Sequence, residues 1–255
     1  MQYLYPAVVA AVSFAFAALV LRQYVHRRRP QQAVWALSLF LSGVGAVAFI
    51  LSTVWLSLAW FRVYYLTGAL LMAALLGQGS LYMALPRRVA GGLLWALVAL
   101  GAVGAYVIFR APADLQALRQ VAATGAGAGV HVLDLGPGLA VLILMNTYGT
   151  VGVFGVALWS AWRVLRRRSP GRLLLGNALI AGGTLINAAA GTMARVLQGS
   201  GAFWVTLAAG TVVLFAGFLA MPGSALAQRP DVAREGSGRP RRDAARRPGD
   251  EVGSP

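Results

Sequence analysis

The sequence predicts an all-α membrane protein: a bundle of seven transmembrane helices with the N-terminus outside and the C-terminus in the cytoplasm. Seven long apolar stretches predict the helices, because each is long enough to cross a hydrocarbon layer of about 30 Å. The composition agrees, since 58% of the residues are hydrophobic and 11% are charged, against about 25% charged residues in a soluble domain. The stretches lack the alternation expected of membrane-barrel strands.

The expected spans follow one another along residues 1–221, which form the predicted membrane domain. They cover residues 3–25, 33–55, 62–85, 89–109, 137–164, 173–197 and 203–221. The first span is followed by arginines rather than preceded by them, so we expect an uncleaved helix and not a secretory signal peptide.

Two segments outside the spans have their own character. The longest internal loop, 110–136, contains a possible short amphipathic helix at 114–121 and then a flexible Gly/Ala-rich stretch, 125–129. Residues 222–255 are rich in Arg, Pro and Gly and have no apolar periodicity. We expect this cytoplasmic tail to be disordered.

The arginines predict the orientation, because they gather on every second loop. One side carries eleven: Arg22, Arg27, Arg28, Arg29, Arg87, Arg88, Arg163, Arg166, Arg167, Arg168 and Arg172. The other carries four: Arg62, Arg110, Arg119 and Arg195. The positive-inside rule puts the richer side in the cytoplasm. The abundance of Ala, Gly, Leu and Val without lysine is typical of GC-rich bacterial coding, so we expect a bacterial plasma membrane.

The composition excludes several kinds of membrane chemistry. There is no cysteine for a thiolate or metal site and no lysine for a retinal Schiff base. The two histidines, His26 and His131, fall on opposite sides of the membrane, and no acidic residue lies within a span. We therefore expect no enzyme, no cofactor and no bound metal. Nucleic acid is not an expected partner either, since most of the basic residues border spans, where topology explains them.

The polar residues of spans 3, 5 and 6 form the candidate site. These residues are Gln78, Asn146, Tyr148, Thr184, Asn187 and Arg195. On span 6 the helical period places Asn177, Thr184, Asn187, Gly191 and Arg195 on one stripe, which should face protein. Asn146 and Asn187 fall at similar depth on antiparallel spans, so we expect them to be neighbours that can hydrogen-bond each other. The alternatives are an interhelical contact or a ligand pocket that includes Tyr148.

Three further features leave alternatives open. Arg195 can pair with Asp114 or Asp134, or anchor at the interface, or bind an anion. The glycine series Gly149-x-x-Gly152-x-x-Gly155 and the stretch from Asn187 to Gly191 allow close helix approach, as between spans 5 and 6. The Gly77-Gln78-Gly79-Ser80 segment of span 3 can pack closely or unwind locally, as in the broken helices of transporters.

Several short motifs resemble those of a group of bacterial multi-pass membrane proteins of unknown function. They are Tyr64-Tyr65-Leu66-x-Gly68-Ala69-Leu70, Gly79-Ser80-Leu81-Tyr82, Pro86-Arg87-Arg88, Gly176-Asn177-x-Leu179-Ile180-Ala181-x-Gly183 and Leu214-Phe215-Ala216-Gly217-Phe218-Leu219. The resemblance covers spans 2 to 7 and implies the fold but no activity. The arrangement is also loosely similar to the seven-helix sensor modules of histidine kinases, although no phosphoacceptor histidine follows the last span.

The leading functional prediction is a non-enzymatic sensor, scaffold or assembly partner. The alternative is a small-solute transporter or ligand-binding membrane protein that uses the polar residues of spans 3, 5 and 6. A reachable cavity lined by Asn146, Asn187 and Gln78 would favour the alternative, and a close-packed interior would favour a scaffold. The expected partners are the lipid bilayer, anionic lipid headgroups at the cytoplasmic arginines, and a separate membrane protein.

Overall fold

The computed structural model describes residues 3–124, 129, 131–166, 171–196 and 202–221, except for the side chains of 191–196. Within this part the chain is almost entirely helical, and seven helices are long and apolar enough to cross a membrane. Among these residues the β-structure is limited to one isolated bridge between Ala113 and Leu133. The predicted all-α class and the seven helices are therefore confirmed. The expected tail, residues 222–255, lies outside the described residues.

The helices keep close to the expected spans. Their bounds are α1 Leu4–Arg27, α2 Pro30–Val54, α3 Leu58–Tyr64, η1 Tyr65–Leu71, α4 Met72–Ala84, α5 Arg87–Arg110, α6 Leu115–Thr124, η2 Gly136–Gly138, α7 Leu139–Arg166, α8 Gly171–Val196 and α9 Ala202–Ala220. α1 ends where Arg28 adopts a left-handed conformation (φ 52°). Pro30 then opens α2, where its missing N–H costs no helical hydrogen bond.

The third span is a single membrane-length helix made of α3, η1 and α4. It begins at Leu58, before the expected Arg62, and its middle segment η1 is a π-helix. A π-helix closes its hydrogen bonds one residue further along the chain than an α-helix. The hydropathy pattern did not predict it, because seven mostly apolar residues do not distinguish these two periods.

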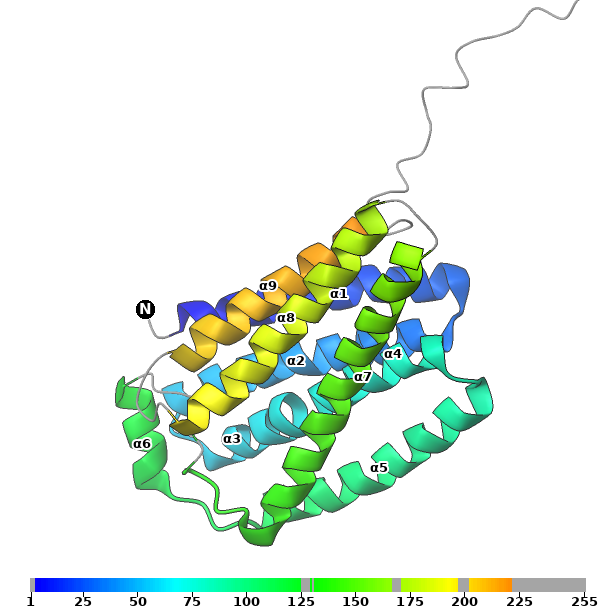
Figure 1. Cartoon of the computed structure of the whole chain (residues 1–255). Helices are drawn as coiled ribbons and strands as arrows, with labels where there is room; N and C mark the ends of the chain where they lie inside the picture. Colours follow the sequence, from blue (N-terminus) through cyan, green and yellow to red (C-terminus); the bar gives the residue numbers. More distant parts are fainter. Residues whose placement is uncertain (1–2, 125–128, 130, 167–170, 197–201, 222–255) are drawn as a thin grey trace, which may run out of the picture.

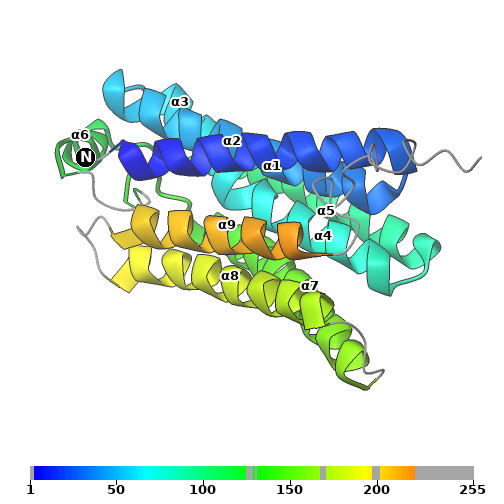
Figure 2. The same cartoon turned by 90° about the horizontal axis from the view of Figure 1, so that it is seen from above.

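The helices pack side by side in pairs, as Figures 1 and 2 show. α1 lies antiparallel to α2 and α8 lies antiparallel to α9, whereas α4 and α7 lie side by side and run in the same direction. α7 crosses the bundle obliquely: near Arg166 it lies close to α8, and near Leu139 it has moved away toward α5 (Figure 1).

The two ends of the bundle differ in charge, and one of them carries the extra helix α6. We call the end that carries α6 the α6 end (Figure 2). The opposite end, which we call the arginine end, holds the facing termini of α1 and α2, of α4 and α5, and of α7 and α8, with Arg27, Arg87 and Arg166 at these termini. The fold thus gathers these arginine-bearing helix termini at one end.

The internal loop that follows α5 is folded onto the bundle rather than extended away from it. Its helix, α6, confirms the predicted amphipathic segment, and its Leu118 and Val121 are buried. Asp114 Oδ1 accepts hydrogen bonds from the backbone N–H groups of Gln116 and Ala117, which caps the helix. Residues 125–128 of the expected flexible stretch lie outside the described residues.

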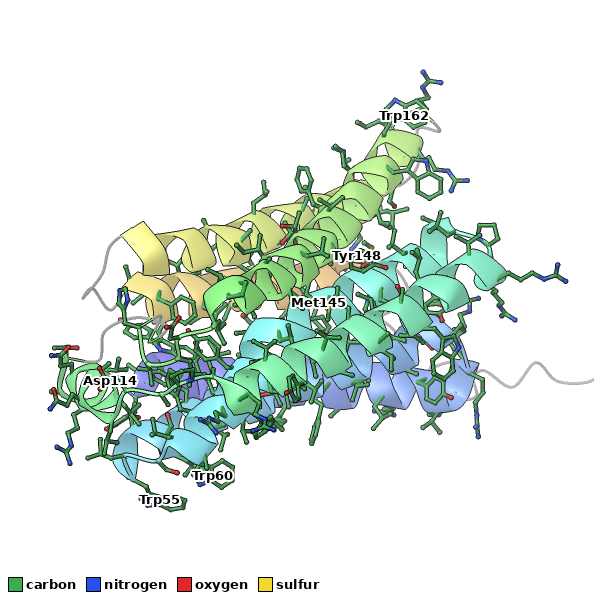
Figure 3. All side chains as sticks on the ribbon, turned by 90° about the horizontal axis from the view of Figure 1, so that it is seen from below. Trp55, Trp60, Asp114, Met145, Tyr148 and Trp162 are labelled. Atoms are coloured by element: carbon green, nitrogen blue, oxygen red, sulfur yellow. The ribbon has the colours of Figure 1, made fainter. Side chains whose placement is uncertain are left out.

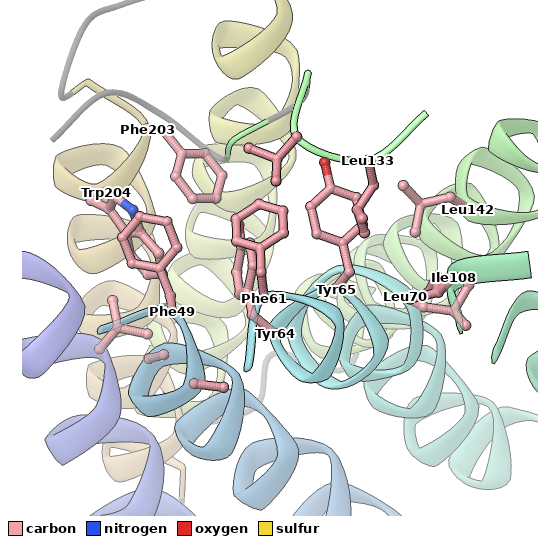
Figure 4. Packing of buried hydrophobic residues seen from close by; sticks show 14 of the residues in the cluster. Phe49, Phe61, Tyr64, Tyr65, Leu70, Ile108, Leu133, Leu142, Phe203 and Trp204 are labelled. Carbon is pink, nitrogen blue, oxygen red and sulfur yellow. The ribbon is translucent and has the colours of Figure 1, made fainter. Parts of the chain in front are cut away.

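Aromatic rings form the core at the α6 end (Figure 4). Trp204 of α9 packs on Phe49 of α2 and on Tyr64 of α3, with ring centroids 4.6 and 6.0 Å apart. Phe61 and Tyr65 continue the cluster toward the α6 loop, where Tyr65 Oη donates a hydrogen bond to the Gly129 carbonyl at 3.3 Å. This cluster fixes the third span, α9 and the loop relative to one another.

Candidate functional site

A cavity of about 620 Å³ lies inside the bundle, in the half nearer the α6 end. Its walls come from α1, α2, the third span, α7, α8, α9 and the loop residues Leu133–Gly136. The helices α2, α4 and α9 bring their small or apolar side chains to it, and α7 and α8 bring most of the polar ones. The polar side chains on the wall include Ser42, Asn146, Thr147, Thr150, Thr184 and Asn187. The volume falls within the range of about 300–1,000 Å³ that is typical of small-ligand pockets.

Asn146 joins α7 to the π-helix at the edge of this cavity. Its Nδ2 donates hydrogen bonds to the Ala69 carbonyl at 2.7 Å and to the Leu142 carbonyl at 2.8 Å. Ala69 lies within η1, so Asn146 satisfies a carbonyl of the irregular segment. A side-chain donor of this kind is a usual partner for backbone groups that a helix irregularity displaces.

The predicted hydrogen bond between Asn146 and Asn187 is wrong. Asn187 Oδ1 has no hydrogen-bond partner in the described part of the protein, and it packs against Gly210 of α9, where a Cβ atom would overlap it. The physical reason is the oblique path of α7, which turns Asn146 toward the third span. Both asparagines line the cavity, but each makes its closest polar or packing contacts with a different neighbour.

A second unpaired polar atom borders the same cavity. Trp204 is only 3% exposed, and its Nε1–H has no acceptor among the described residues. An unpaired buried donor or acceptor costs about 1–3 kcal/mol. The cavity wall thus contains one residue with a free acceptor, Asn187, and one with a free donor, Trp204.

Gln78 and Tyr148 meet at a three-helix junction outside the cavity. Gln78 is fully buried in α4, and its Nε2 donates to the Ala90 carbonyl of α5 at 2.6 Å. The hydroxyl of Tyr148 on α7 donates to Gln78 Oε1, and Figure 3 shows Tyr148 on α7 near the middle of the bundle. This pair therefore links three helices, and α4 stays α-helical through Gly77–Ser80 rather than unwinding.

Gly149 and Gly152 of α7 face α4 and not α8, which corrects the expectation that the glycine series brings spans 5 and 6 together. A Cβ at Gly77 would lie 2.7 Å from Gly149 Cα, and one at Gly152 would lie 3.0 Å from Gly77 Cα. Gly155 has nothing within 4 Å of its added Cβ. The close approach of α7 to α4 is what tilts α7 away from α8 and opens the cavity.

The stripe on α8 faces protein where its side chains are described. Asn177 is 3% exposed and donates to Ser160 Oγ of α7 at 3.0 Å, which holds the two helices together toward the arginine end. Thr184 is 6% exposed, lines the cavity and donates to the Ile180 carbonyl within its own helix.

Arg195 belongs to the last turn of α8, and its side chain lies outside the described residues. Asp114 and Asp134, its expected partners, both accept hydrogen bonds from nearby backbone N–H groups. Neither carboxylate forms an ion pair with a described residue, and within the same part of the chain no three His, Cys, Asp or Glu side chains gather to hold a metal.

Some cavity residues were not predicted from the sequence. Tyr64, Tyr65 and Trp204 are buried and line the cavity, although tyrosine and tryptophan near the ends of membrane spans usually lie at the interface. Thr147 and Thr150 follow the candidate Asn146 on α7, and they too line the cavity. Whether their side chains reach the cavity depends on how α7 is tilted. Hydropathy predicts which segments cross a membrane and contains no information on that tilt.

Comparison with known proteins adds no relative on which to base a function. No family model, curated protein or solved structure matches the chain. The resemblance to bacterial multi-pass proteins and to kinase sensor modules therefore stays a prediction, and the functional argument has to rest on the cavity.

Proposed function

We propose that the protein is a non-enzymatic, ligand-binding sensor of the bacterial plasma membrane. The observation that carries this proposal is the cavity of about 620 Å³ lined by Asn146, Thr184 and Asn187. A scaffold needs no such space, and an empty volume inside a bundle forfeits packing contacts that a filled core would make. A bound molecule would recover those contacts.

The packing of the other half of the bundle favours a sensor over a carrier. Toward the arginine end, Phe16 packs on Phe215 and Phe218 with ring centroids 4.9 and 4.7 Å apart, and the void beside them measures about 50 Å³. Transport would require this packed half to open. Binding and sensing require only that the ligand change the balance between two arrangements of the helices.

The charge distribution supports the orientation and the lipid contacts of this sensor. We assign the arginine end to the cytoplasm because of the positive-inside rule. Two exposed pairs border that end on α7, with the Arg163 and Arg166 guanidinium groups 4.3 and 4.1 Å from the ring centroids of Trp159 and Trp162. Such pairs suit a headgroup layer, where anionic lipids would be their partners. Any further signal would pass to a separate membrane protein.

The test is to ask what the protein carries when it is purified from its own membranes. We expect mass spectrometry of organic extracts to find a small molecule that is enriched with the wild type and depleted from Thr150→Phe, which fills the cavity. Leu144→Phe is the matched control, because Leu144 is on the same helix, is 56% exposed and does not line the cavity.

Re-adding the extracted compound should raise the melting temperature of the wild type, since a ligand that binds only the folded state stabilises it. Equal amounts of every extracted compound in all three proteins, combined with normal helix content by circular dichroism, would overturn the proposal.

A further inference from the structure

The cavity has a mouth along one side of α7. Leu139, Ile143, Thr147 and Val151 line the cavity and are at the same time exposed, and Val151 reaches 64%. Their spacing of four residues places them on one stripe of the helix, about 18 Å long at 1.5 Å per residue. The cavity-lining residues of α2, α4, α8 and α9 are buried or half-buried instead.

This mouth lies between α7 and α8. α8 supplies Thr184, Asn187 and Ala188 to the wall, whereas no residue of α5, the neighbour on the other side of α7, lines it. Figure 1 shows α7 and α8 close together near Arg166 and apart near Leu139. In a membrane-spanning bundle, such a gap between two helices faces lipid rather than water.

The wall suits an uncharged ligand. Among the residues whose side chains are described, Asp134 is the one carboxylate on it, at the margin by the α6 end, and no arginine lines it. A charged group deep in the cavity would find no counter-ion among these residues, and leaving a charge unpaired in a low-dielectric site is strongly unfavourable. Asp134 would in addition repel an anionic headgroup at the mouth.

The reachable polar groups of the wall lie on α7. Thr147 is exposed at the mouth and Thr150 is half-buried, and both line the cavity. The unpaired atoms of Asn187 and Trp204 are buried themselves and do not face the open space. A ligand with a hydroxyl or carbonyl group for these threonines, followed by an apolar chain, matches this wall.

We propose that the cavity takes up a neutral, single-chain lipid from the bilayer through the mouth between α7 and α8, with its uncharged polar head at Thr147 and Thr150 and its chain against the apolar wall. This inference rests on the proposed ligand-binding function and names the class of ligand. The head would carry hydroxyl and carbonyl groups, as an acylglycerol does, so that it can both donate to and accept from the threonine hydroxyls.

The experiment uses the full-length protein in lipid nanodiscs and a monoacylglycerol that carries a photoreactive diazirine in its chain. We expect saturable labelling of α7, α8 and α9 peptides around the cavity, competed by unlabelled monoacylglycerol. Thr147→Phe, which narrows the mouth, should weaken the labelling about tenfold, because the probe would lose a modest part of its binding free energy. Leu144→Phe, which lies one turn away and faces outward, should leave it unchanged.

A lysophosphatidylglycerol with the same diazirine chain tests the charge argument, and we expect it to label the cavity at least about tenfold less. Labelling that does not saturate, that spreads over outward-facing residues, or that favours the anionic probe would overturn the proposal. A compound that co-purifies with the wild type but not with Thr150→Phe, without competing with the lipid probe, would retain the proposed function and reject this inference.

Discussion

At the scale of single residues, three buried or half-buried polar side chains donate hydrogen bonds to backbone carbonyls of other helical segments. Asn146 donates to Ala69, Gln78 to Ala90, and Ser38 of α2 to Met72 of α4. Such bonds contribute about 0.6–2 kcal/mol each inside a membrane. They fix which helices are neighbours, because an apolar surface gains little free energy when it contacts protein instead of lipid.

The two asparagines should therefore behave differently when they are replaced. Asn146→Leu should lower the free energy of unfolding by about 1 kcal/mol, because the Ala69 carbonyl loses its donor. Asn187→Leu should cost less, since it removes an oxygen that has no partner. The double variant should show the sum of the two effects within about 0.5 kcal/mol. Steric trapping in bicelles measures all three, and a strong coupling would mean that the two side chains bond after all.

The Gln78–Tyr148 pair should show the opposite behaviour. Gln78→Leu should destabilise the protein by about 1–3 kcal/mol, because it leaves the Tyr148 hydroxyl and the Ala90 carbonyl without their partner. Tyr148→Phe should cost less, and the double variant should cost less than the sum of the singles, since the bond is already lost in each. Additive costs in the same unfolding measurement would contradict the hydrogen bond.

At the scale of elements, the contact between α4 and α7 decides the shape of the cavity. Gly149→Ala should destabilise the protein by about 1–3 kcal/mol, because its Cβ would overlap the backbone of Ala73 and push the helices apart. Gly155→Ala is the matched control on the same helix: it meets nothing within 4 Å and should be neutral or slightly stabilising. Thermal unfolding in detergent compares the two, and equal melting temperatures would show that α7 does not rest on α4.

Sequence reasoning predicted the elements well and their partners poorly. The apolar stretches predicted the seven helices, and the amphipathic period predicted α6. Hydropathy does not predict which small-residue faces meet, so the glycines of α7 were assigned to α8 when they pack on Gly77 of α4. For the same reason the cavity was not predicted, because it depends on the tilt that this contact gives α7. The π-helix was not predicted either, because Asn146 reaches the Ala69 carbonyl only in the folded protein.

At the scale of the whole molecule, the charges set the expected direction of insertion. The connections at the arginine end carry most of the arginines, and those between helix ends at the α6 end carry few. Exposed tryptophans border both ends, with Trp55 and Trp60 at one and Trp162 at the other (Figure 3). Aromatic residues favour both membrane interfaces, so they fix the depth of the bundle but leave its direction to the arginines.

Reporter fusions can read this direction. A fluorescent protein that matures only in the cytoplasm should be bright when fused after Arg29, after Arg88, after Arg168 and at the C-terminus. A fusion within 125–129 should stay dark there and should become active when the reporter is a phosphatase that matures only outside. Each position thus has two reporters with opposite expectations, which separates a wrong topology from poor expression. Bright fluorescence at 125–129 would place α6 in the cytoplasm and turn the mouth of the cavity toward the inner leaflet.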